Sequence, residues 1–299
     1  MKYTNKFGLP KSLENFLNKN PHDSGGARFT VTGLLNPPRI EQLRKENYSN
    51  ITEDISDKVM SLIGVATHLI LSEGAADDEI AEERVFCVVD GVKISGQIDL
   101  QTPVDGGWRL TDYKTTSAYA IMSSSEGKLE HQQQLNCYAE MVERAKGVVV
   151  KELEVVAFAR DWSRASVSRN KNYPKAPIVR IPIPLWSKEE RSEFLEERVR
   201  LHWFWDEKGQ SPENTLPECS PADMWERRFA VHEFKLNGEP RKNPKSRFET
   251  EDKALNYMMD NAIKGKIISS DDKRTRCEGN YCGVNQFCKQ WKEYNDGRE

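Results

Sequence analysis

The 299-residue sequence has no stretch approaching the ~18 uninterrupted apolar residues that a membrane-crossing helix needs. Its first residues, Met1–Lys6, lead into no apolar stretch of the kind found in secretory signals. Neither sign of charge is in large excess, because 44 Lys and Arg residues face 47 Asp and Glu residues, giving a net charge of −3. We therefore expect a cytoplasmic, intracellular protein with no membrane partner. The charge balance excludes a uniformly basic nucleic-acid coat but not a local basic groove.

Cysteine is scarce and unevenly placed: of six residues, half (Cys277, Cys282 and Cys288) fall within twelve positions. In a reducing cytosol, such clustered thiols more often bind metal than form disulfides. Cys87 and Cys137 fall inside predicted core elements and are interpreted as buried small hydrophobic side chains. The hydrophobic share of 37% is enough to bury one large core or two small ones.

Helical and strand patterns alternate along the middle of the chain. The predicted helices cover residues 55–72, 128–145 and 187–208, and the predicted strands cover 84–89, 92–100, 108–114, 148–158 and 178–185. Asp90-Gly91 is typical of a two-residue hairpin turn, and Ser187 with Glu190 is typical of a capping box. This order predicts an α/β (α+β) fold. We expect an N-terminal helical and loop segment over 1–54, a core over 55–210, and a C-terminal cysteine-bearing subdomain over 211–299 packed on the core.

Two acidic residues and a lysine stand out on the second and third predicted strands. Because strand side chains alternate, Asp112 and Lys114 point the same way about 7 Å apart, and a hairpin would let Asp99 approach both. Neighbouring carboxylates repel unless a cation lies between them, and Mg²⁺ prefers such oxygen ligands. A solvated hairpin face is the alternative interpretation. Glu82 and Glu83, just before the first strand, either add acidic character here or are solvated strand-edge charges, and the second interpretation is favoured.

The order of several polar residues along the chain is more informative than each residue alone. Taken singly, His68 on the first helix, and Gln134 and Tyr138 four apart on the second, are typical of structural residues. Taken together, His68, Gly96-x-x-Asp99, Asp112-x-Lys114 and Gln134-x-x-x-Tyr138 resemble the PD-(D/E)XK nuclease superfamily over residues 55–160. The pattern is most similar to the RecB-type exonuclease branch, which includes phage-encoded and CRISPR-associated exonucleases with a cysteine cluster.

The resemblance implies a restriction-endonuclease-like mixed sheet flanked by helices, and metal-dependent hydrolysis of phosphodiester bonds that leaves a 5′-phosphate. It implies that Asp99, Asp112 and His68 hold Mg²⁺ or Mn²⁺ and that Lys114 positions or activates the attacking water. Gln134 and Tyr138 would hold the nucleic-acid strand or order the site. The family often has Glu where this chain has Asp112, which is a mild departure.

A fourth cysteine, Cys219, precedes the C-terminal three, and four thiolates complete either a tetrahedral Zn²⁺ site or a [4Fe–4S] cluster. The resemblance favours the iron–sulfur cluster. However, its members have the fourth cysteine upstream of the core and a gap of two between the first C-terminal pair, whereas this chain has Cys277-x4-Cys282. The identity of the metal therefore stays open.

A basic stretch with interleaved aromatics, Trp162 and Tyr173, is a candidate surface for single-stranded DNA or for duplex ends. Its cations are Arg160, Arg164, Arg169 and Lys171, and a solvated loop is the alternative. The leading hypothesis is a DNA exonuclease that prefers single-stranded ends and acts in recombination, replication or degradation of phage or host DNA. The alternatives are a structure-specific endonuclease with the same site, a non-catalytic DNA-binding module, and a metal-stabilised interaction protein. Homo-oligomers and a recombination or replication partner protein are both compatible with the sequence.

Overall fold

A computed structural model describes residues 1–19, 24–122, 127–208, 216–269 and 274–297. The chain forms two compact units, one of Met1–Leu35 with Thr52–Gly209 and one of Asn36–Ile51 with Gln210–Glu299. Residues 36–51 thus group with the C-terminal unit, whereas the sequence placed them in an N-terminal segment over 1–54. Packing of the C-terminal unit on the core stays a prediction.

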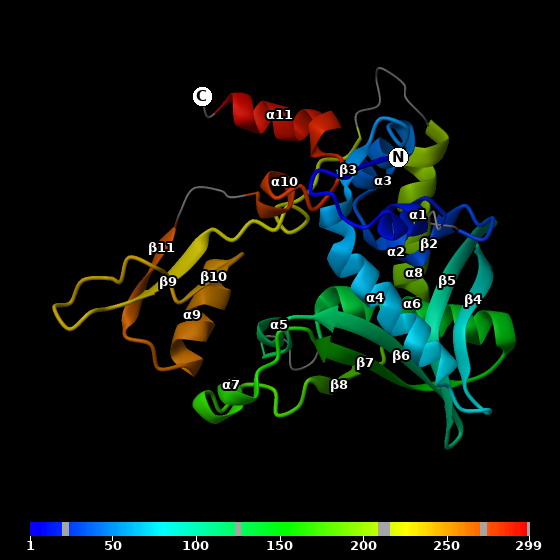
Figure 1. Cartoon of the computed structure of the whole chain (residues 1–299), viewed down its shortest axis with the longest axis horizontal. Coiled ribbons are helices and arrows are strands. Elements are labelled where there is room, and N and C mark those ends of the chain that lie inside the picture. The colour runs from blue at the N-terminus through cyan, green and yellow to red at the C-terminus, as the bar shows by residue number, and fades with distance from the viewer. Residues whose placement is uncertain (20–23, 123–126, 209–215, 270–273, 298–299) are drawn as a thin grey trace. The chain divides into compact units, whose positions relative to one another are not determined.

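The first unit is built around a mixed sheet flanked by helices (Figure 1), which confirms the expected fold class. Six strands form this sheet within the described residues, in the order β2-β5-β6-β7-β8 with β4 pairing to β5. Its strands are β2 (Phe29–Thr30), β4 (Ile80–Val89), β5 (Val92–Val104), β6 (Gly107–Thr116), β7 (Val150–Ala159) and β8 (Ile178–Ile183). β6 and β7 are parallel, whereas the pairs β4–β5, β5–β6 and β7–β8 are antiparallel. A separate parallel pair joins β1 (Lys2–Thr4) to β3 (Thr52–Asp54).

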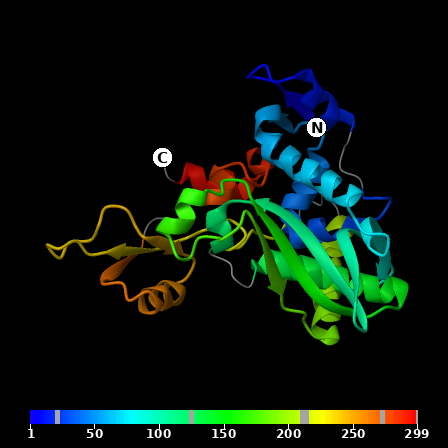
Figure 2. The same ribbon diagram turned by 60° about the horizontal axis from the view of Figure 1, so that its bottom comes forward.

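Helices cover both faces of the sheet, with α4 over one face and α6 over the other (Figures 1 and 2). The helices of this unit are α1 (Lys11–Lys19), α2 (Val31–Leu35), α4 (Ile55–Glu73), α5 (Ala118–Met122), α6 (Leu129–Lys146), α7 (Arg164–Arg169) and α8 (Lys188–Lys208). α6 is the most deeply buried of them and supplies Leu135, Ala139 and Met141 to the main core. Gly147 ends α6 in a left-handed conformation at φ 67°, where glycine carries no Cβ penalty.

Local signals that the sequence offered recur in the structure. Asp90 and Gly91 have φ values of 48° and 79°, as a type I′ hairpin turn requires, and they join β4 to β5. Ser187 and Glu190 form the expected capping box at the start of α8: the Ser187 N–H donates to Glu190 at 2.8 Å, and the Glu190 N–H donates to Ser187 at 3.2 Å. Strand β4 begins at Ile80 and is therefore longer than expected.

α4 is strongly apolar on average, although its apolar residues do not form one uninterrupted run. An 18-residue window of it has a mean hydropathy of 1.3, although Ser, Thr, Gly and His interrupt the run. Among the described residues it is the one helix that could cross a membrane by length and composition alone, which is weak evidence by itself. Within this structure it lies on the sheet: its His68 ring meets the Tyr113 ring of β6 edge-on, with centroids 5.8 Å apart. The absence of a membrane partner stays a prediction.

The second unit combines a small sheet with short helices. Its antiparallel strands, in the order β10-β9-β11, are β9 (Phe229–Glu233), β10 (Ser246–Phe248) and β11 (Gly265–Ser269). Its helices are α3 (Pro38–Glu46), α9 (Glu251–Asp260), α10 (Thr275–Glu278), the 3₁₀ turn η1 (Asn285–Phe287) and α11 (Lys289–Asp296). α9 packs on this sheet through Ala254, which meets Val231 and Ile263 in a local core. Arg39 of α3 donates to the Pro217 carbonyl at 2.9 Å, which explains why residues 36–51 belong here.

Candidate functional site

The carboxylates gather where strands β5 and β6 part. Their antiparallel ladder ends at the pair Leu100–Thr111, one residue before Asp99 and Asp112 would face each other. In place of the next ladder bond, the backbone N–H of Tyr113 donates to Asp99 Oδ2 at 2.7 Å. Opening the ladder exposes backbone groups, and here a carboxylate satisfies one of them. The residues expected on neighbouring strands are therefore brought together at a split in the sheet.

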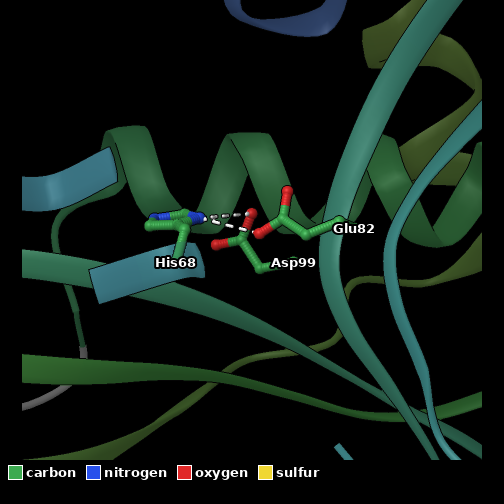
Figure 3. Close-up of side chains that lie close together, drawn as sticks. All are labelled: His68, Glu82 and Asp99. Atoms are coloured by element: carbon green, nitrogen blue, oxygen red, sulfur yellow. Dashed lines mark hydrogen bonds and ion pairs between the residues drawn. The ribbon is translucent and has the colours of Figure 1, made fainter. Parts of the chain in front are cut away.

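A histidine and two carboxylates form one cluster at this split (Figure 3). His68 Nδ1 from α4 lies 3.1 Å from Glu82 Oε1 of β4 and 3.5 Å from Asp99 Oδ1 of β5. In the described part of the chain, these three are the one group of His, Cys, Asp or Glu ligand atoms that all lie within 4.8 Å of one another. His68 Nε2 lies 3.3 Å from the Tyr113 carbonyl oxygen, which can only accept, so this contact favours a proton on Nε2 and leaves Nδ1 as the nitrogen that faces the carboxylates, with either a proton or a cation on it.

The electrostatics of the cluster call for a positive charge. Burial, and then repulsion from Asp112, raise the pKa of Asp99 to about 7. The hydrogen bond to Glu82 and the nearby Asp99 charge raise the pKa of His68, although burial opposes this. A nitrogen lone pair aimed at two carboxylates is stable only with a proton or a metal cation between them. The donor set of one imidazole and two carboxylates suits a divalent cation such as Mn²⁺ or Mg²⁺.

The buried Asp112 and the half-buried Lys114 form an ion pair beside this cluster. Lys114 Nζ lies 2.8 Å from each Asp112 carboxylate oxygen, and the Asp112 side chain is 4% exposed. Burial disfavours the charge on Lys114, but the attraction of Asp112 and then of Asp99 outweighs it and raises the pKa of the ammonium. Lys114 therefore carries a positive charge at neutral pH. The metal-ligand role predicted for Asp112 stays a prediction, since this carboxylate pairs with the lysine.

Gln134 and Tyr138 support the site from the face covered by α6. Both are buried, and the Gln134 amide donates to the Tyr138 hydroxyl at 2.9 Å. The Tyr138 ring lies against Gly96 of β5, where a Cβ atom would be 2.7 Å from the ring carbon Cε1. Glycine is therefore needed at the start of the Gly96-x-x-Asp99 segment so that the ring and the strand can approach closely. Of the two predicted roles, this geometry fits ordering of the site.

Sequence reasoning missed two residues. Glu82 was interpreted as a solvated charge, yet it contacts His68 and accepts from the Gln97 amide at 2.7 Å. The hairpin register could have revealed it: Val89 pairs with Val92, so counting back along both strands places Glu82 opposite Asp99. His131, on the first turn of α6, is the second. Its buried Nδ1 has no hydrogen-bond partner among the described residues, and burial and then Lys114 lower its pKa, so the ring is neutral.

The four candidate cluster cysteines line one cavity in the second unit. Cys219, Cys277, Cys282 and Cys288 share it with the side chains of Ile40, Leu43, Met224 and Val284 and with two arginines, Arg39 and Arg276. All four thiols are free of disulfides. A hydrogen bond from Cys277 lowers the pKa of Cys282 to about 6, whereas burial raises that of Cys219 to about 12. Cys87 and Cys137 are buried in the first unit, as expected.

The candidate DNA-binding cations lie on and around α7. Arg160, Arg164, Arg169 and Lys171 are exposed, and within the described residues none of them forms an ion pair. The two aromatics between them are partly buried. Trp162 donates to the Pro174 carbonyl at 2.8 Å, and the Tyr173 hydroxyl accepts from the Ser163 N–H at 3.0 Å. Both side chains pack against the core, and stacking of bases on them stays a prediction.

Comparison with known protein families gives a match over most of the chain. The model of the PD-(D/E)XK nuclease superfamily matches residues 61–289, which include both the carboxylate site and the cysteines. No curated protein matches the chain.

Two solved structures are similar to parts of it. The structure named SSO0001 is 18% identical with a TM-score of 0.42, and the match covers 64% of this chain and 82% of that one. The structure named "Putative exonuclease" from Eubacterium rectale is 11% identical with a TM-score of 0.32, and the match covers 60% of this chain and 70% of that one. Both TM-scores are below 0.5, so no property of this chain is inferred from either structure.

Proposed function

Because the chain belongs to the PD-(D/E)XK nuclease superfamily, we propose that it is a Mg²⁺- or Mn²⁺-dependent deoxyribonuclease that degrades DNA from its ends, with a preference for single strands. One observation carries the proposal. His68, Glu82 and Asp99 converge within 4.8 Å beside the buried Asp112–Lys114 pair, at the split between β5 and β6. A polyanionic substrate would be repelled from such an acidic site unless a cation is bound there.

His68, Glu82 and Asp99 would hold the catalytic cation, and Asp112 lies close enough to Asp99 to raise its pKa. A bound divalent cation would supply Lewis-acid polarisation of the phosphate and activation of a water molecule. The imidazole ligand favours Mn²⁺ over Mg²⁺, because Mg²⁺ prefers oxygen donors alone. Glu82→Gln would keep the shape of the side chain but remove a ligand charge, so it should weaken Mn²⁺ binding.

The chain's other residues act on charge and orientation. The Lys114 ammonium, held by Asp112, lies where it can stabilise negative charge that develops on the phosphate during hydrolysis. Gln134 and Tyr138 fix the strand that carries Asp99. His131 on the same helix face has a buried Nδ1 that pairs with none of the described residues.

Cleavage of end-labelled single-stranded DNA beside a covalently closed circle tests the proposal, with Mn²⁺, Mg²⁺ or EDTA, and with Asp112→Ala as the matched control. We expect metal-dependent loss of the linear strand by the wild-type protein only. Cutting of the circle would make the protein an endonuclease with the same site. No cleavage of either substrate would refute the assignment and favour a DNA-binding module on the nuclease fold.

We further propose that the cysteine cavity holds a [4Fe–4S] cluster in preference to Zn²⁺. Sulfurs around one Zn²⁺ ion, with Zn–S bonds of ~2.3 Å, lie about 3.8 Å apart. In the described part of the chain, no three of these four sulfurs lie within 4.8 Å of one another. Wider spacing suits a larger cofactor, and Arg39 and Arg276 suit its net negative charge. Iron, zinc and sulfide analysis of anaerobically purified protein, with its visible absorption spectrum, decides between the two.

The finer biological assignments belong to the same proposal. Membership of the RecB-type branch rests on the residue order from His68 to Tyr138 and on the cysteines. Because its substrate would be DNA, we place its action inside the cell, in recombination, replication or degradation of host or phage DNA. The exposed cations Arg160, Arg164, Arg169 and Lys171 are the proposed phosphate contacts.

A further inference from the structure

Trp225, in the second unit, has a strained backbone. Its φ of 55° lies in the left-handed region, which is a genuine outlier for a bulky side chain. Two backbone hydrogen bonds hold the conformation: the Trp225 N–H donates to the Ala222 carbonyl at 3.1 Å, and the Glu226 N–H donates to the Pro221 carbonyl at 3.0 Å. Such strain persists where the surrounding structure enforces it, and it often marks a functional residue.

The strain presents an aromatic surface to solvent. Trp225 is 40% exposed and Tyr281 65% exposed, and their ring centroids lie 5.3 Å apart with the ring planes inclined at 43°. Tyr281 rests on Gly279, where a Cβ atom would be 2.3 Å from the ring carbon Cε2, so the ring is fixed from below. In the described part of the chain, neither the indole N–H nor the phenol hydroxyl has a hydrogen-bond partner. Two large rings are thus held in fixed positions with no partner for their outer surface.

Positive charge lies next to the two rings. The Arg276 guanidinium is 5.4 Å from the centre of the Trp225 ring and is held by the Asp223 carbonyl at 3.2 Å and by Asn36 Oδ1 at 2.8 Å. The Arg227 side chain is 61% exposed, and the one ion pair that it forms with the described residues, to Glu249, is long at 3.8 Å. Arg227, two positions after Trp225 in the sequence, is therefore available to a phosphate. Aromatic faces beside cations are the combination that binds single-stranded nucleic acid.

We propose that Trp225 and Tyr281 form a platform on which an unpaired base of the DNA strand stacks, with Arg227 contacting the neighbouring phosphate. This deepens the proposed nuclease function and rests on it for the identity of the strand. The base must be unpaired, because bases inside a duplex already stack on both faces. The cations distinguish this surface from a purely apolar docking patch, and the chain's net charge of −3 shows that they are a local feature.

Binding of a fluorescein-labelled oligothymidylate to the full chain, measured by anisotropy with no divalent cation added, tests the platform. The comparison probe is an abasic oligomer of the same length, which keeps the phosphates but offers no base. The variants are Trp225→Gly, Tyr281→Ala and, as the matched control, Tyr281→Phe, which keeps a ring. Removing one stacking ring should weaken oligothymidylate binding about 5-fold to 150-fold, and should leave binding of the abasic oligomer unchanged.

Thermal unfolding supplies a second readout. Glycine adopts a φ of 55° without strain, so Trp225→Gly relieves the backbone while it removes the contacts of the ring with Tyr281 and Arg276, and a cooperative melting transition shows that the variant is folded when its weaker binding of oligothymidylate is measured. Equal losses on both probes, or unchanged binding in Trp225→Gly and Tyr281→Ala, would each overturn the platform. If Tyr281→Phe binds as weakly as Tyr281→Ala, the ring is not what binds, and the platform is again refuted.

The outcome separates this proposal from the nuclease assignment. Wild-type protein that cleaves DNA while the variants bind normally would refute the platform alone. Wild-type protein that binds but never cleaves, with binding lost in the variants, would support the platform and refute the nuclease. Failure of the wild type to bind either probe would refute the platform.

Discussion

Replacing Gly96 by alanine probes the support of the active site with the smallest possible change. The new Cβ atom would lie 2.7 Å from Tyr138 Cε1, 2.9 Å from Tyr138 Cδ1 and 3.4 Å from Met141 Sδ. The first two distances are shorter than real Cβ contacts, so the ring must move. It has little freedom to do so, because Tyr138 is 5% exposed and its hydroxyl accepts from Gln134.

The expected cost follows from overpacking. Inserting one methyl group into a well-packed core typically costs about 1–3 kcal/mol in the free energy of unfolding. Gly64 offers a matched control in the same unit: it lies inside α4, and a Cβ atom there would meet nothing within 4 Å. Alanine at that helical position should stabilise the protein by about 0.5–1 kcal/mol, because glycine loses more backbone entropy on folding. The two variants should therefore differ by roughly 1.5–4 kcal/mol, with opposite signs relative to wild type.

Urea unfolding followed by circular dichroism measures these differences, and the nuclease assay measures their consequence. Gly96→Ala should also lower cleavage, because a displaced Tyr138 carries Gln134 with it and shifts the strand that bears Asp99. Gly64→Ala should cleave as the wild type does. A Gly96→Ala protein as stable as the wild type would refute the close approach of ring and strand, and with it the ordering role of Tyr138.

Three further predictions concern the charges and the cysteines. Lys114→Ala should reduce cleavage to background while DNA binding stays within a few-fold of wild type, as a gel-shift assay would show; wild-type turnover would contradict the assignment. Apparent Mn²⁺ affinity, measured by calorimetry, should weaken at least tenfold for each pH unit below about 6, because the cation must displace protons from Asp99, whose pKa is about 7, and from His68, whose pKa is also raised. In the metal-free protein the same raised pKa favours the folded state at low pH, and this contribution is lost as pH rises from about 4 to about 7; an affinity independent of pH between 5 and 7 would refute the burial argument. Cys282→Ser should lose bound metal and lower the melting temperature, because metal-binding energy at such sites is folding energy, and an unchanged melting temperature would show that the thiols are unliganded.

The hairpin and the helices could be predicted because local chemistry determines them. Asp90-Gly91 sets the β4–β5 register, and Gly147 and the Ser187 capping box set two helix ends. Spacing alone also placed Asp112 beside Lys114. The approach of Asp99 to the neighbouring strand could be predicted from the alternation of side chains along a strand.

Other features depend on tertiary context that single positions do not encode. Glu82 reaches His68 from a backbone with φ of 52°, inside a strand where alternation assumes extended residues throughout. Burial, and then Lys114 on a different element, lower the pKa of His131. Trp162 and Tyr173 have the composition of a base-stacking surface, and the fold packs both partly against the core, whereas Trp225 and Tyr281, 56 residues apart, meet only in the folded chain.

The discontinuity of the second unit has a consequence for synthesis. Arg39 and Arg44 of α3 donate to the carbonyls of Pro217 and Cys282, which follow them by 178 and 238 residues. At ~5–20 residues per second, α3 waits roughly 10–50 seconds on the ribosome for these partners. The sheet of the first unit, complete by residue 208, can form in that interval. The carboxylate site can therefore be assembled first, and the proposed loading of metal at the cysteines would be a later step that needs the chain through Cys288.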